Sequence, residues 1–232
     1  IFVKEIVMIT DEELKVLFLS LRVGFFCVLI SLPPAILLGW VLARANFRGK
    51  VILDGICHLP LVLPPVVTGY VLLVLFSRRG VLGGFLQKAL GIQVAFDWKG
   101  AVLASAVVGF PLMLRAIRLA IESVDLRLES AARTLGAGPL RAFASVTLRL
   151  AQPGLLVGAL LAFARSLGEF GATITFVSNI AGTTRTLPLA IYTLLNRPDG
   201  DEAVFRLVII SVVISFTALV ASEGLARRMR RD

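Results

Sequence analysis

Long apolar runs, separated by short polar segments, dominate the chain. Five of them are long enough for helices that cross a bilayer, which takes about 20 residues, and we predict spans at 16–43, 51–76, 98–119, 150–177 and 203–225. The first run is too long for a cleavable signal peptide and lacks a small-residue cleavage site. The pattern therefore predicts an all-α polytopic membrane protein, with one transmembrane domain over residues 1–232.

Three prolines interrupt the second run, at Pro60, Pro64 and Pro65. Proline removes a backbone donor and kinks a helix, and such breaks persist in a bilayer only where neighbouring protein satisfies the freed carbonyls. We expect this span to be kinked or partly unwound. Pro64, Pro65 and Gly69 form a candidate gate that moves during transport, and a static kink is the competing interpretation.

Two segments are neither spans nor simple loops. One covers residues 120–145, and the other covers residues 178–202. The second contains "TLPLAIYTLL" at 186–195, which is apolar but too short to cross a bilayer. It predicts a re-entrant half-helix or an interfacial helix.

Composition and charge support a membrane protein and orient it. The chain is 57% hydrophobic and 17% charged, whereas soluble domains have about 45–50% apolar and 25% charged residues. The net charge is +9. Clusters of Arg and Lys at 44–50, 115–141 and 227–231 mark one side as cytoplasmic by the positive-inside rule, and Arg78, Arg79 and Lys88 are a minority signal on the other side. The acidic "TDEE" falls on the other side. We predict a periplasmic N-terminus and a cytoplasmic C-terminus, and no nucleic-acid partner.

The polar residues provide no candidate for catalysis. Cys27 and Cys57 lie in apolar context, and His58 has no second ligand near it in sequence, so neither a disulfide nor a metal site is expected. The phosphate-loop pattern Gly-x-x-x-x-Gly-Lys-Ser/Thr is absent from the sequence. The chain is not expected to be an enzyme, to have catalytic residues or to hold a cofactor.

The chain also lacks a visible internal repeat. Many secondary transporters contain two inverted halves in one chain, but five spans do not divide into halves. A two-fold symmetric pathway would therefore need a second copy, which predicts a homodimer surrounded by membrane lipid.

The segment "ESAARTLGAGPLRAF", residues 129–143, is a candidate coupling site. Ala132 and Gly136 are four apart and would share a helix face, Gly136 and Gly138 allow a turn, and Pro139 suits the start of a new helix. We predict two short helices at an angle, with a notch of small residues at the corner. A plain amphipathic connector is the alternative.

The fourth predicted span contains polar residues where charge is costly. Arg165 and Glu169 are four apart, and Ser166, Thr173 and Thr175 extend the polar character. One hypothesis is that these five residues line or frame a translocation pathway. The other is that Arg165 and Glu169 form a structural ion pair. Arg185, in the outer loop, either receives an anion or a binding protein or is a solvated loop residue.

The 129–149 segment resembles the EAA loop of permease subunits of ATP-binding-cassette importers. Ala131, Ala132 and Gly136 match that pattern in register, and Leu148 falls in place further along. The chain departs from it at three places: Ser130 stands where Glu is expected, with Glu129 one position early; Val146 replaces Ile; and Arg149 replaces Pro. The resemblance implies a coupling helix that docks into a separate ATPase subunit, with Glu129, Ala131, Ala132, Gly136, Gly138 and Pro139 as its residues.

The stretches "LPPVVTGY" and "RSLGEFGATI" resemble permease subunits of oxyanion importers, those for molybdate most closely and those for sulfate or thiosulfate more loosely. The resemblance implies the type I ABC importer permease fold in a bacterial inner membrane. It also implies import of molybdate, and of tungstate, with two ATP-binding subunits that hold Mg-ATP and a periplasmic oxyanion-binding protein. Sulfate import is the runner-up. An ion-coupled secondary transporter and a channel are rivals from other classes.

Overall fold

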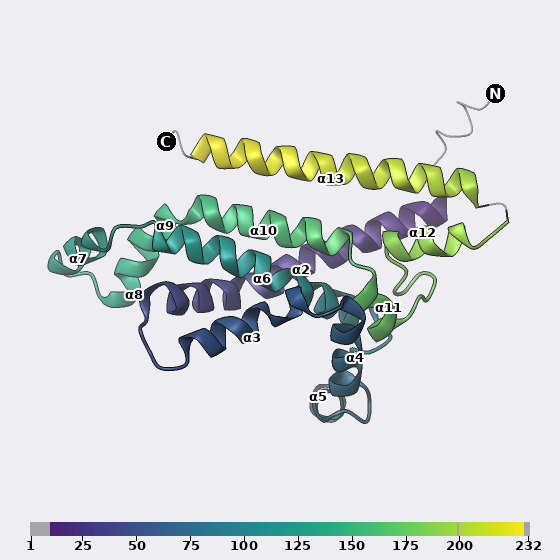
Figure 1. Ribbon diagram of the computed structural model, residues 1–232, viewed down its shortest axis with the longest axis horizontal. Helices are drawn as coiled ribbons and strands as arrows, with labels where there is room; N and C mark the ends of the chain where they lie inside the picture. The colour runs from purple at the N-terminus through teal and green to yellow at the C-terminus, as the bar shows by residue number, and fades with distance from the viewer. Residues whose placement is uncertain (1–9, 199, 230–232) are drawn as a thin grey trace.

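The computed structural model describes residues 10–198 and 200–229, and these residues form helices and loops with no strand among them. Four long helices lie side by side: α2 (Asp11–Arg44), α6 (Trp98–Glu122), α10 (Gln152–Leu167) and α13 (Asp201–Met229) (Figure 1). The shorter helices are α3 (Lys50–Val62), α4 (Pro65–Phe76), α5 (Val81–Leu90), α7 (Leu126–Thr134), α8 (Pro139–Ala142), the π-helical turn η1 (Phe143–Thr147), α9 (Leu148–Leu150), α11 (Gly171–Val177) and α12 (Leu187–Leu195). Arg230 and Arg231, which contribute to the predicted orientation, lie outside the described residues.

Three of the described helices are long and apolar enough to cross a membrane: α2, α6 and the Asp201–Ala221 part of α13. Two further candidates are pairs of helices bent at a short break: α3 with α4, and the 139–150 segment with α10. The number of spans reaches five, by length and composition, if each bent pair is one span. The fold is thus an all-α membrane architecture, as the hydrophobic pattern predicts.

The predicted span at 51–76 is not one continuous helix. α3 ends at Val62, α4 begins at Pro65, and the two axes meet at 111°. The break falls within the proline stretch because Pro65 has no amide hydrogen to continue the helix and Pro64 restricts the residue before it. The bend turns α4 out of the bundle. Together with α5, which the sequence analysis did not predict, α4 forms an arm beside it (Figure 1).

The break in the second span agrees with the prediction of a kinked or partly unwound helix, whereas the predicted span at 150–177 is wrong as a single helix. α10 ends at Leu167, and a new helix, α11, begins at Gly171. The carboxylate of Glu169 accepts a hydrogen bond from the Ala172 amide at 2.8 Å. It therefore satisfies a donor that the first turn of a helix leaves free. This capping contact explains why helix starts again in an apolar stretch.

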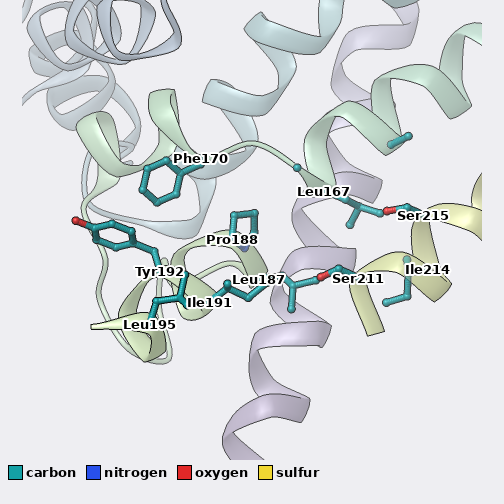
Figure 2. A pocket seen from close by; sticks show the side chains of 12 residues that line it. Leu167, Phe170, Leu187, Pro188, Ile191, Tyr192, Leu195, Ser211, Ile214 and Ser215 are labelled. Atoms are coloured by element: carbon teal, nitrogen blue, oxygen red, sulfur yellow. The ribbon is translucent and has the colours of Figure 1, made fainter. Parts of the chain in front are cut away.

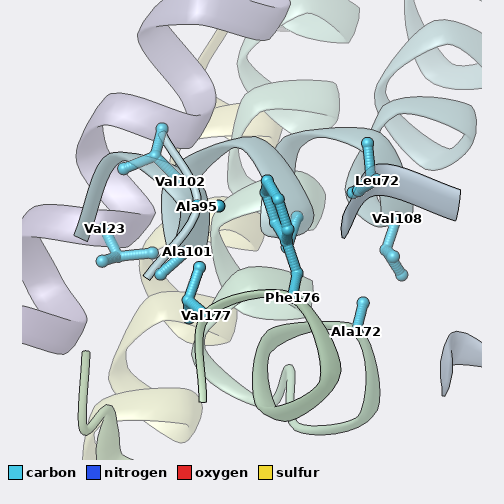
Figure 3. Close-up of a cluster of buried hydrophobic side chains, with 10 residues drawn as sticks. Val23, Leu72, Ala95, Ala101, Val102, Val108, Ala172, Phe176 and Val177 are labelled. Carbon is cyan, nitrogen blue, oxygen red and sulfur yellow. The ribbon is translucent and has the colours of Figure 1, made fainter. Parts of the chain in front are cut away.

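The core of the bundle is centred on α6. Of its apolar window, 67% is buried, compared with 6% for α13. α11 is anchored to this core by Phe176 and Val177, both fully buried, which pack among side chains of α2, α4 and α6 such as Val23, Leu72 and Val108 (Figure 3). The short helix α11 is thus held by the core, whereas α13 presents most of its apolar surface outward.

The arm and the bundle meet where α4 crosses α11 at almost backbone contact. A Cβ atom at Gly69 would lie 2.6 Å from the Ala172 carbonyl oxygen and 2.9 Å from the Thr175 Cβ. A Cβ atom at Gly171 would lie 2.9 Å from the Pro65 Cβ. Because both glycines lack a side chain, the two short helices pack closely, as helices in membranes do at small residues.

The opposite end of the bundle from α7 is fastened by a buried ion pair. Glu13 closes a capping box with Thr10 at the start of α2 and also pairs with Arg206 of α13, with 3.0 Å between Oε1 and Nη2. Leu187, at the start of α12, donates its amide to the Ser20 hydroxyl at 2.8 Å. The first and last long helices are therefore joined at the end where α12 also lies (Figure 1).

We expect Gly69→Ala to destabilise the protein by about 1–3 kcal/mol, because the new methyl group meets backbone and Cβ atoms that cannot move aside cheaply. Gly55→Ala is the matched control. A Cβ there meets no atom within 4 Å, and alanine in a helix stabilises by about 0.5–1 kcal/mol relative to glycine. Thermal unfolding of the two detergent-purified variants measures this. Equal midpoints would contradict the tight α4–α11 contact.

Candidate functional site

The predicted coupling segment folds as a helical corner. α7 ends with Gly136 in the left-handed region, at φ +90°. The Gly136 amide donates to the Arg133 carbonyl and the Ala137 amide donates to the Ala132 carbonyl, both at 3.0 Å. These two bonds form a Schellman motif, in which glycine is favoured because it adopts positive φ without strain. The motif therefore ends α7, and the second helix of the corner, α8, begins at Pro139.

The predicted notch of small residues is wrong in one respect. Gly136 lies beyond the end of α7 and does not share a helix face with Ala132. Gly136 serves the turn itself, and a Cβ at Gly136 or at Gly138 would meet no atom of this chain within 4 Å. Pro139 occupies the first turn of α8, as predicted, with Gly138 as its N-cap.

The corner presents large apolar side chains to its surroundings. Leu135 is 89% exposed and Leu140 is 84% exposed, on either side of the Gly136–Pro139 turn, and no residue of α7 is buried. Exposed apolar residues next to one another at a turn are typical of surfaces that contact a partner. The sequence analysis did not select these leucines. Their position on either side of the Gly-Ala-Gly-Pro break is the sequence feature that could have identified them.

Glu129 and Ala131, the remaining coupling candidates, lie on different sides of α7. Ala131 is exposed, whereas Glu129 is half-buried and accepts a hydrogen bond from the Thr147 hydroxyl of η1. Thr147, which sequence reasoning missed, is fully buried. The displaced glutamate therefore has a partner within its own chain.

The predicted pathway residues come together at the break between α10 and α11. Arg165 Nη1 lies 2.7 Å from Glu169 Oε2, and Glu169 is only 2% exposed, compared with 30% for Arg165. Ser166 and Thr173 are also buried. Glu169 thus combines an ion pair with a helix-capping hydrogen bond, which matches the interpretation of a structural pair. The role of these residues along a pathway stays a prediction.

The gate candidates and the pathway candidates contact one another. Pro65 and Gly69 of α4 face Gly171 and Thr175 of α11, and the Thr175 hydroxyl donates to the Gly171 carbonyl at 2.9 Å. Two groups that are about a hundred residues apart in sequence therefore form one packed unit. Whether α4 moves relative to α11 during transport stays a prediction.

One cavity among the described residues was not predicted. It has a volume of about 500 Å³ and lies between α10, α12 and α13 (Figure 2). The Phe170 and Tyr192 rings, 5.2 Å apart, stand at one side of it. No charged side chain is among its described lining residues. Its lining residues are Ala164, Leu167, Gly168, Phe170, Leu187, Pro188, Ile191, Tyr192, Leu195, Ser211, Ile214 and Ser215.

The loop between α11 and α12 holds Arg185 in a polar network. Its Nε donates to the Asn179 Oδ1 at 2.9 Å, and Asn179 donates in turn to the Thr193 hydroxyl at 2.7 Å. Arg185 also lines two small cavities, of about 170 and 230 Å³, that share Glu12. The loop arginine is therefore positioned by hydrogen bonds, and its contact with an anion or a binding protein stays a prediction.

A second charged cluster joins α3 to α6. Arg118 pairs with Asp54 at 3.0 Å and with Glu122 at 2.8 Å, and His58 Nδ1 lies 3.2 Å from Asp54 Oδ1. The cluster fixes the broken span to the central helix near the end where the coupling corner lies. Sequence reasoning saw His58 as isolated, whereas the structure pairs it with Asp54, one turn earlier in α3, and Asp54 in turn with Arg118 of α6. Among the described residues, no group of His, Cys, Asp and Glu has the arrangement of a metal site.

Residues 35–231 match the family of binding-protein-dependent transport system inner membrane components. The molybdenum transport system permease protein ModB of Escherichia coli (strain K12) is 58% identical over 222 residues, which cover 96% of this chain and 97% of that protein. ModB of Haemophilus influenzae is 53% identical over 219 residues, covering 94% and 96%. The sulfate transport system permease protein CysT of Salmonella typhimurium is more distant, at 37% identity over 79% of this chain and 66% of CysT.

Solved structures support the same fold. The crystal structure of a bacterial alginate ABC transporter in complex with an alginate pentasaccharide-bound periplasmic protein contains a chain that matches with a TM-score of 0.73. The identity is 18%, and the match covers 95% of this chain and 80% of that one. The fold is that of type I ABC importer permeases, as the resemblance of the coupling segment implies.

We expect Gly136→Ala to open the corner, because a residue other than glycine in the left-handed region costs about 1–2 kcal/mol. Amide hydrogen exchange at 126–142 should become about tenfold faster as a result. Gly138→Ala is the matched control, since Gly138 has φ −64° and equal free space. An equal exchange rate in the two variants would exclude a conformational role for Gly136.

We expect Arg165→Leu to lower stability by about 3 kcal/mol, because it leaves the buried Glu169 carboxylate without its partner. Arg165→Leu combined with Glu169→Gln should recover most of this loss, since the amide oxygen still accepts from Ala172. Thermal unfolding measures both variants, and transport is then assayed with the double variant. A double variant that transports at the normal rate would exclude these two residues from the pathway.

Proposed function

Because the chain belongs to the family of inner membrane components of binding-protein-dependent transport systems, we propose that it is the membrane-spanning subunit of an ATP-driven importer of molybdate. The assignment of molybdate as the substrate rests on the 58% identity to a molybdenum permease along 96% of the chain. Tungstate, a tetrahedral dianion of related size, belongs to the same substrate class. The lower identity to a sulfate permease makes sulfate the less favoured substrate.

Energy for transport comes from a separate ATPase subunit that binds Mg-ATP. The Leu135 and Leu140 side chains support this part of the proposal, because they are apolar and almost fully exposed at the corner. The corner lies at the same end of the bundle as the C-terminal end of α13 (Figure 1). The arginines in this region support a cytoplasmic position for that end, by the positive-inside rule. The periplasmic end then holds Thr10, α12 and the Arg185 loop.

Two copies of the chain form the pathway. Two observations support a second copy: the small buried fraction of α13, and the arm of α4 and α5 that leaves the bundle. Apolar surfaces of this kind are covered in a membrane either by lipid or by another helix. Each copy presents its corner to one of two ATPase subunits.

The proposed cycle depends on the corner as a lever. Closure of the ATPase dimer moves the two corners, and each corner is continuous with α10 through η1 and α9. Movement of α10 displaces the break at Glu169 and the α4–α11 contact, and the pathway alternates between outward and inward access. A periplasmic binding protein delivers the oxyanion near Arg185. The permease needs only weak contacts with the oxyanion, because transport requires a difference between states and not a tight site.

Reconstitution tests the proposal. Permease, ATPase subunit and binding protein are combined in proteoliposomes, and uptake of labelled molybdate is measured with and without ATP. We expect uptake that requires ATP, that tungstate inhibits and that an equal concentration of sulfate leaves unchanged. Stronger inhibition by sulfate than by tungstate would assign a sulfate permease. Uptake that proceeds without ATP and stops when ion gradients are dissipated would assign a secondary transporter.

A further inference from the structure

Glu129 is directed toward the interior of the coupling corner. All residues of α7 are exposed except Glu129 and Ala132, which are half-buried. They lie three positions apart and therefore on one face of the helix. Ser130, which occupies the glutamate position of the EAA pattern, is exposed. One residue corresponds to about 100° around a helix, so the displaced glutamate faces the chain's own η1 turn while the pattern position faces outward.

The contact that Glu129 makes there joins α7 to the base of α10. Its Oε1 accepts the hydrogen bond from the Thr147 hydroxyl. Thr147 is fully buried, and its carbonyl accepts the Ala151 amide at 2.9 Å, directly before α10 begins. The bend of 68° between the η1 side and α10 falls at this position. A π-helical turn such as η1 occurs often at functional sites.

Other contacts fix the two ends of the coupling segment and leave α7 itself free. Arg44 Nη2 donates to the Val124 carbonyl at 2.7 Å, before α7. The Phe143 ring packs edge-on against Trp40 at 5.7 Å, after α8. Both anchors belong to α2. Glu129 makes the side-chain hydrogen bond that ties α7 to the segment following the corner.

We propose that Glu129 is a positioning residue that acts inward on Thr147, and that this hydrogen bond makes α7, α8 and η1 move as one body with the base of α10. The inference rests on the proposed function, since it concerns how motion of the corner reaches the spans. It differs from a direct contact between Glu129 and the ATPase. Without the bond, α7 can follow the ATPase while α10 stays behind, so ATP hydrolysis becomes uncoupled from transport.

Four single variants separate the inward role from an outward one. Thr147→Val and Glu129→Leu remove the hydrogen bond with little change of volume, whereas Thr147→Ser keeps the donor and Glu129→Gln keeps an acceptor oxygen without the charge. Each is assembled with the ATPase subunit in proteoliposomes. Two quantities are measured: the affinity between permease and ATPase, and the number of ATP molecules hydrolysed per molybdate transported.

We expect Thr147→Val and Glu129→Leu to raise the ATP consumed per molybdate about tenfold, as for loss of a hydrogen bond to a charged group, with ATPase affinity unchanged. The double variant, Thr147→Val with Glu129→Leu, should consume no more ATP per molybdate than either single variant. Thr147→Ser and Glu129→Gln should stay close to wild type.

Weakened ATPase affinity in Glu129→Gln, with normal coupling in Thr147→Val, would overturn the inference, because the charge would then act outward. If the apolar variants do not fold, the affinity of Glu129→Gln alone still decides between the two roles. Failure of the wild-type permease to bind the ATPase would instead contradict the proposed function.

Discussion

A bilayer offers no water to backbone polar groups, so each break in a spanning helix must be satisfied by the protein itself. This constraint explains the centre of the structure. Two of the breaks in the described residues, at Pro64 and at Gly168–Phe170, are connected because α4 packs directly on α11. At the second break Glu169 satisfies the Ala172 amide and is itself neutralised by Arg165.

Glu169 therefore has to meet two requirements. Glu169 carries a charge in an apolar region, which is costly unless it is paired, and it also starts the helix that anchors Phe176 in the core. Gly69 and Gly171 allow the arm to lie against that helix. A movement of α10 would have to preserve the ion pair or exchange it for another. This requirement ties the geometry of the break to the cycle that we propose.

The coupling corner is held together in a different way. Its shape comes from local chemistry: an N-cap at Asp125, a glycine at positive φ and a proline that starts α8. Its attachment comes from long-range contacts, through Arg44 and Trp40 of α2 and through Thr147. Leu135 and Leu140 stay exposed, while Glu129 on the inner side of α7 is bonded to Thr147 of the same chain. The corner is thus tied to the rest of the chain on one side and apolar on the other.

The sequence by itself determined the features that depend on local pattern and on the bilayer. Runs of apolar residues predicted the helical membrane class, Pro64 predicted the broken second span, and the Gly-Ala-Gly-Pro stretch predicted two short helices, since each signal acts within a few residues. Only the tertiary structure decided that Gly168–Phe170 divides the fourth span, that α4 crosses α11, and that Glu129 faces Thr147. These outcomes depend on which atoms from distant parts of the chain satisfy one another, and periodicity along the chain does not record such pairings.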